Sequence, residues 1–245
     1  LGWFFVHRYY QEFFPNEISN ASALGSAIGE SFGPLNALFA ALGFAAVLLT
    51  LYVQGNALRA QQRDQYLQRF DVTFFELLRL LRESKIDVQF SHSPSYRNEK
   101  SPKRLNLVGV RSGQSAFSAA MRECRHWMKS PDISKEEISG LYLKYVHSRY
   151  ESRLGPYFRL LYTILDRINN DKFLGEDEKK FYGNLLRSQL SSHEVGLAGI
   201  NGLAPVAKDL SKLITKFRIL KYLPEGHMRR LLEKNYAEEA FEERD

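Results

Sequence analysis

The sequence predicts an all-α protein in which an N-terminal transmembrane helix hairpin precedes a helical bundle domain. Three observations predict it. Residues 31–58 carry no charge, and apolar residues recur at three- and four-residue spacing after this stretch. No alternating pattern of any length indicates a β-strand. The 245 residues are enough for a membrane region, expected over 1–53, and one domain with its own core, expected over 54–245.

The uncharged stretch contains a run, residues 34–53, in which only Asn36 and Thr50 are polar. A helix of this length reaches about 30 Å, the thickness of the hydrocarbon core of a bilayer. The alternative is a buried core helix, but such helices usually carry polar residues along one face, and this run does not. We therefore expect residues 34–53 to cross a membrane.

Small residues recur within this predicted span. They are spaced four apart and form a ladder that lets a second helix approach closely. The alternative is that alanine is simply frequent in membrane spans. The ladder consists of Ala37, Ala41 and Ala45.

The start of the chain predicts a second, truncated span. Residues 1–6 are apolar and aromatic, and His7 and Arg8 follow them. Aromatic residues beside a first charge are typical of the membrane–water interface. A trimmed signal sequence is the alternative, but no small-residue cleavage pattern is visible. We expect the end of span 1 at about residues 1–6 and an external loop over residues 7–33.

Charge predicts the orientation of this hairpin. Arg8 is the sole basic residue before position 54, whereas the whole chain has a net charge of +6. Arg59, Arg63 and Arg69 follow the span closely. Basic residues favour the cytoplasmic side, so we expect residues 54–245 in the cytoplasm and the short loop outside. The three arginines are also candidates for contact with anionic lipid head groups.

The pattern after the span predicts helices separated by polar turns. Apolar spacing continues over residues 58–81, and the segment Ser91–Arg104 is expected to be a polar loop. Ser134 and Glu137 have the spacing of a capping box. Further helices are expected over 113–129, 134–152, 156–169 and 176–201 and from Pro205 onward.

A polar stripe stands out in the predicted helix 176–201, where four polar residues fall at helical spacing on one face. One interpretation is a solvated face with modest surface contacts. The other is a polar seam that binds a partner or lies inside the fold, because Asn and Ser are poor choices for helix solubility alone. The four residues are Asn184, Arg187, Ser191 and Glu194, and the candidate seam adds Tyr182 to them.

No metal site and no cofactor site is predicted. Cys124 is the single cysteine, so no internal disulfide can form. Cys124 and His126 point to different faces of a predicted helix, and no second pair accompanies them. The glycines at positions 196, 199 and 202 lack the spacing of a dinucleotide loop, and Gly196 and Gly199 are expected to permit close helix packing.

Several segments resemble a known family, the phage abortive infection proteins of the putAbiC type. The resemblance rests on YFRLLYTIL (157–165), FYGNLLRSQLSSHE (181–194) and KFRILKYLP (216–224), with TFFELL (73–78) as a weaker match. It implies bacterial defence, in which an effector stops the host cell once infection is sensed. We expect this effector in the bacterial inner membrane, where it kills or arrests the infected cell by membrane disruption after release or activation by a sensor. We expect membrane lipid, a second copy of the chain or a defence-system sensor as partners, and the resemblance allows the sensor to be a reverse transcriptase with its RNA–DNA product. The family offers no established catalytic residues.

Two alternatives remain beside a non-enzymatic effector. One is a metal-independent RNase of the HEPN kind, in which Arg187 would stabilise phosphate charge and His193 would move a proton. Their spacing of six positions matches that pattern, although a chain with 34 Lys or Arg and six His is expected to contain such a pair by chance. The other is a non-toxic scaffold or sensor subunit.

Nucleic-acid contact is a further candidate, through the basic residues of the polar loop. With only Tyr96 available for base stacking there, the ordinary interpretation of these charges is a solvated face. The candidates in the loop are Lys100, Lys103 and Arg104.

Overall fold

The computed structural model describes residues 15–100 and 109–242, and the chain divides into two compact units, Leu1–Leu67 and Gln68–Asp245. The all-α class is confirmed, because the described residues form helices with one sheet of two very short strands. The unit boundary lies after Leu67, whereas the sequence placed the domain boundary at residues 53 and 54.

The first described element is α2 (Pro15–Asp87), a helix of 73 residues. The segment predicted as an external loop, residues 7–33, is helical from Pro15 onward, and its position outside the membrane stays a prediction. Proline suits the first position of a helix, but Gly25, Gly29 and Gly33 lower the helix propensity of this segment, which is why its composition indicated a loop. The predicted end of span 1, residues 1–6, lies outside the described residues.

The uncharged part of α2 is exposed to solvent in the first unit. Phe39, Phe44 and Tyr52 each leave more than half of their surface exposed, at 63%, 66% and 68%. Among the described residues, one helix is long and apolar enough to cross a membrane, and it is this one. A membrane anchor is thus indicated by length and composition.

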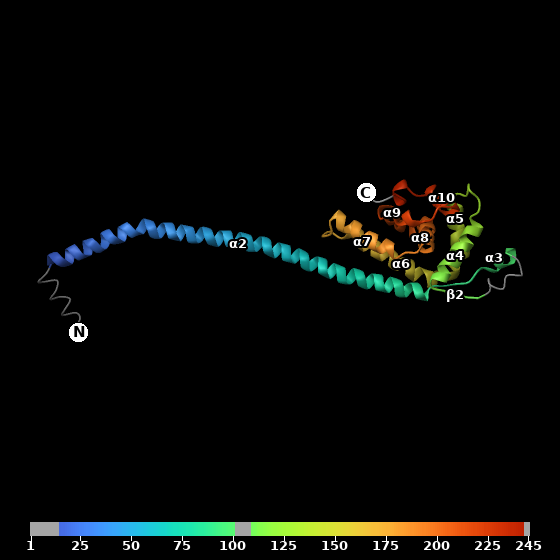
Figure 1. The fold of residues 1–245 in the computed structure, drawn as a ribbon, viewed down its shortest axis with the longest axis horizontal. Coiled ribbons are helices and arrows are strands. Elements are labelled where there is room, and N and C mark those ends of the chain that lie inside the picture. The colour runs from blue at the N-terminus through green and yellow to red at the C-terminus, as the bar shows by residue number, and fades with distance from the viewer. Residues whose placement is uncertain (1–14, 101–108, 243–245) are drawn as a thin grey trace. The chain divides into compact units, whose positions relative to one another are not determined.

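The second unit contains the end of α2 and all later elements (Figure 1). Its two strands pair antiparallel, with Gln89 opposite Ser112. The later elements are β1 (Gln89–Phe90), α3 (Pro94–Glu99), β2 (Arg111–Ser112), α4 (Gln114–Trp127), α5 (Lys135–Tyr142), the π-helical turn η2 (Leu143–His147), α6 (Ser148–Asn170), α7 (Glu176–Ser188), α8 (Ser192–Leu203), η3 (Pro205–Ala207), α9 (Lys208–Lys216), η4 (Ile219–Tyr222), α10 (His227–Glu233) and η5 (Glu238–Ala240).

Helix α8 forms the centre of this unit. All its residues from Glu194 to Leu203 are buried, and it contacts α4, α5, α9 and α10 (Figure 1). Its glycines make this possible: a Cβ on Gly196 would overlap Met121, and one on Gly199 would lie 2.7 Å from a methyl carbon of Leu232. The predicted role of these glycines in close packing is confirmed.

The capping box at Ser134 and Glu137 is confirmed, since each residue bonds to the backbone N–H of the other. Three other sequence predictions are wrong. Pro156 lies inside α6 rather than at a helix start. The polar loop contains α3, because Ser93 accepts a hydrogen bond from the N–H of Tyr96 and Pro94 suits the first helical turn.

The third wrong prediction is the single helix over 176–201, which is two helices. α7 ends at Ser188 and α8 begins at Ser192. The side chain of Ser191 accepts a hydrogen bond from the N–H of Glu194, so it caps a new helix instead of continuing the old one. Ser and Thr side chains compete for backbone groups in this way, and apolar spacing alone does not reveal it.

Candidate functional site

The predicted polar stripe is not one face of one helix. Tyr182, Asn184 and Arg187 lie on α7, whereas Ser191 caps α8 and Glu194 lies in its first turn. The helix break changes the direction of every side chain after Ser188. The stripe therefore divides into three separate polar contacts, around Arg187, Glu194 and Tyr182.

Arg187 is 4% exposed, and its guanidinium forms hydrogen bonds with the turn that follows α9. Its guanidinium donates hydrogen bonds to the carbonyl of Arg218 at 3.2 Å and to Oδ1 of Asn184 at 2.7 Å. It also lies over the ring of Tyr222. Arg218 has φ of 51°, a left-handed conformation that is strained for a side chain of this size. Arg187 thus stabilises an unfavourable turn.

Glu194 is 1% exposed and joins three elements. Its carboxylate accepts hydrogen bonds from the hydroxyl of Tyr157 on α6 at 2.6 Å and from Nζ of Lys85 on α2 at 2.7 Å. It also accepts one from the backbone N–H of Ser191. Burial and the Glu194 charge hold the pKa of Tyr157 well above its ordinary value, so this hydroxyl remains a donor.

Tyr182 forms the third contact. Its hydroxyl donates to Oδ1 of Asp71 on α2 at 2.6 Å, and its ring packs against Phe70 and Phe74. Burial and the Asp71 hydrogen bond raise the pKa of Tyr182. The contact connects α7 to the part of α2 that belongs to the second unit.

Arg187 and His193, the candidate nuclease pair, have different surroundings. His193 lies in the first turn of α8, and burial with the charges of Arg125 and Arg122 on α4 lowers its pKa, so the imidazole is neutral at pH 7. Arg187 instead bonds the turn after α9. The HEPN pattern requires both residues on one helix, and the break between α7 and α8 removes that condition.

The remaining candidates lie on surfaces. The alanine ladder of residues 37, 41 and 45 is exposed along α2. Arg59, Arg63 and Arg69 are exposed on the same helix, and Lys100 is exposed just after α3. Lys103 and Arg104 lie outside the described residues.

The structure also contains a buried carboxylate that the sequence did not indicate. Glu123 of α4 is fully buried; His92 Nδ1 lies 3.0 Å from its carboxylate, and the N–H of Ser93 lies 3.1 Å away. Arg149 of α6 lies 3.6 Å away. His92 and Ser93 belong to the segment that was expected to be a polar loop, so no local pattern marked them as buried. Among the described residues, no group of three or more His, Cys, Asp or Glu side chains could hold a metal ion.

These observations define a class: an all-α unit held together by buried polar contacts, on a chain with one helix able to cross a membrane. Residues 149–228, from the start of α6 into α10, match the model of a family described as "Putative phage abortive infection protein", putAbiC. The resemblance predicted from the sequence is confirmed for this segment, which contains Arg187, His193 and Glu194. No curated protein and no solved structure matches the chain. The family match associates the second unit with antiviral defence by abortive infection.

A pair of substitutions separates a structural Arg187 from a catalytic Arg187–His193 pair. We expect Arg187→Ala to lower the free energy of unfolding by roughly 1–3 kcal/mol, because the turn at Arg218 loses its donor. We expect His193→Tyr to remain folded and active, since His193 contributes no proton transfer. Chemical denaturation and a cell-killing assay measure the two effects. Folded but inactive protein for both His193→Tyr and His193→Ala would restore the nuclease hypothesis.

Proposed function

We propose that this protein is an anti-phage effector that sits in the bacterial inner membrane and stops the infected cell by disrupting that membrane. In this proposal residues 34–53 anchor the chain and the second unit lies in the cytoplasm. The observation that carries it is the uncharged, exposed stretch of α2 on the same chain as an abortive infection segment. In water, an apolar surface of this length would be unfavourable by about 25 cal/mol per Å².

Charge supports the proposed orientation. Arg59, Arg63 and Arg69 are exposed on α2 directly after the uncharged stretch, where lipid head groups would lie. Membrane lipid is therefore the first proposed partner. Nucleic-acid contact through Lys100 or the neighbouring loop would be indirect, through a partner that carries the nucleic acid.

Regulation would come from protein partners. A span that disrupts a membrane has to be inactive until infection, so we propose that the second unit is held by a defence-system sensor or by another copy of the chain. Release would then let the spans assemble through their small residues. No catalytic step is part of this proposal.

The test follows membrane potential and total RNA together in infected cells. We expect depolarisation to precede any loss of intact RNA. RNA cleavage before depolarisation would overturn the proposal in favour of an endoribonuclease. Cells that keep both their potential and their RNA while they express the protein and survive would instead point to a scaffold or sensor.

A substitution in the alanine ladder tests helix association. We expect Ala41→Leu to weaken killing without reducing membrane insertion, because insertion follows overall apolarity whereas close helix approach depends on small side chains. The matched control is Ala46→Leu, which adds the same side chain on another face of the helix. Killing efficiency and the amount of protein in the membrane fraction measure the effect. Equal killing by both variants at equal abundance would exclude the ladder as a contact face.

A further inference from the structure

A pocket in the second unit has no role in the proposed membrane function. Its volume is about 520 Å³, and it lies between α6, the end of α8 and the start of α9. Pockets of this size accommodate small-molecule ligands. The residues that matter here are His147, Phe158, Tyr162, Asn201 and Lys208.

Asn201 is the first observation that points to a ligand. It lines the pocket and is only 4% exposed, yet its side-chain amide has no hydrogen-bond partner among the described residues. Its amide atoms are not among the buried side-chain atoms that are cut off from solvent without a partner, so they are accessible from the pocket. A ligand that offers both a donor and an acceptor can bond such an amide directly.

The start of α9 supplies a site for an anion. Its N-cap residue is Ala207, so no side chain caps the first turn, and the first three residues of α9 line the pocket. Lys208 lies in the same turn and forms no ion pair with any described residue. The acidic neighbours are engaged elsewhere: Asp209 lies 3.6 Å from Lys212, and Glu151 lies 2.7 Å from Arg159.

The opposite wall is aromatic. Phe158 and Tyr162 are four residues apart on α6, so both face the pocket from one side of that helix. His147 ends the π-helical turn η2, and π-helical turns of this kind occur frequently at functional sites. Flat rings beside an amide suit a planar heterocycle, which stacks on rings and hydrogen-bonds through its edge.

We propose that this pocket binds a nucleoside monophosphate. The phosphate would lie at the N-terminus of α9 beside Lys208, the base would lie against Phe158 and Tyr162, and Asn201 would bond the edge of the base. An aromatic wall, an amide and an anion site within one pocket match the three parts of that ligand. The proposal concerns binding and is independent of how the membrane is disrupted.

The test measures binding of the four common nucleoside monophosphates to the full chain in detergent, by calorimetry and thermal shift. We expect at least one of them to bind and to raise the melting temperature. We expect the matching nucleoside alone and inorganic phosphate alone to bind at least about tenfold more weakly, because each occupies one half of the pocket. Equal binding of phosphate alone would overturn the nucleotide assignment.

Variants identify the site. Lys208→Ala should weaken the nucleotide at least about tenfold and leave the nucleoside unchanged. Lys216→Ala, an exposed lysine at the other end of α9 that does not line the pocket, should change neither. Asn201→Leu should fold and should weaken both. The proposal is overturned if no nucleotide binds at up to roughly 10 mM to protein shown to be folded. It is also overturned if Lys208→Ala and Asn201→Leu bind as the wild type does.

Discussion

Replacing Glu194 by alanine is expected to lower the free energy of unfolding of the second unit by about 3–5 kcal/mol. The substitution leaves Lys85 charged and Tyr157 without its acceptor, in a place that is 1% exposed. It also removes half of the capping box of α8, the central helix. Urea denaturation of the full chain in detergent measures the change.

Glu137→Ala is the matched control for this prediction. Glu137 occupies the same capping-box position at the start of α5, but it is exposed and has no buried partner to leave behind. We expect a loss of at most about 1 kcal/mol for it. If Glu194→Ala is no more destabilising than Glu137→Ala, the buried contacts of Glu194 contribute nothing beyond the helix cap.

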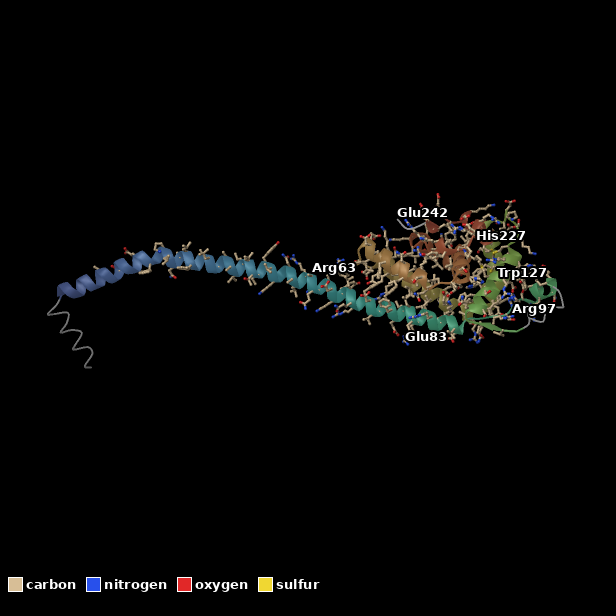
Figure 2. All side chains as sticks on the ribbon, in the orientation of Figure 1. Arg63, Glu83, Arg97, Trp127, His227 and Glu242 are labelled. Carbon is tan, nitrogen blue, oxygen red and sulfur yellow. The ribbon has the colours of Figure 1, made fainter. Side chains whose placement is uncertain are left out.

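Replacing Glu123 by alanine is expected to have an effect of similar size, about 3–5 kcal/mol, since Arg149 and His92 lose the carboxylate between them. The indole of Trp127, at the end of α4, also donates to this carboxylate, so its fluorescence reports on the site (Figure 2). Glu136→Ala, an exposed acid in the first turn of α5, is the control and should change stability by less than about 1 kcal/mol. Equal effects of the two substitutions would contradict the assignment of Glu123 as a structural carboxylate.

The Glu123 contact also predicts a pH dependence. Burial would raise the pKa of Glu123, but hydrogen bonds from His92, Ser93 and Trp127 outweigh burial and leave the pKa below its ordinary value of 4.5. A lowered pKa in the folded state means that the contribution to stability is present above about pH 4.5 and is lost as the pH falls through the folded pKa. We expect stability to fall less steeply below pH 4.5 in Glu123→Gln than in the wild type. Parallel curves would assign acid sensitivity to other groups.

Much of the fold could be predicted from local patterns. Helical spacing, the Ser134–Glu137 capping box and the close-packing glycines of α8 each depend on residues near one another in the chain. The break at Ser191 could have been predicted as well, because Ser191 and Glu194 have the same capping-box spacing as Ser134 and Glu137. The apolar spacing on both sides of the break hid it.

The sequence by itself determined the helical class, the long uncharged stretch of α2 and the family of residues 149–228, because composition and short-range spacing carry all three. Only the tertiary structure decided which polar residues are buried and which groups they form hydrogen bonds with. Lys85 and Glu194 are 109 positions apart, and Arg187 bonds a turn 31 positions away. A buried polar side chain stabilises the fold only when it has such distant partners, because burial without a partner is unfavourable. A local sequence pattern does not show which distant residues will lie beside it.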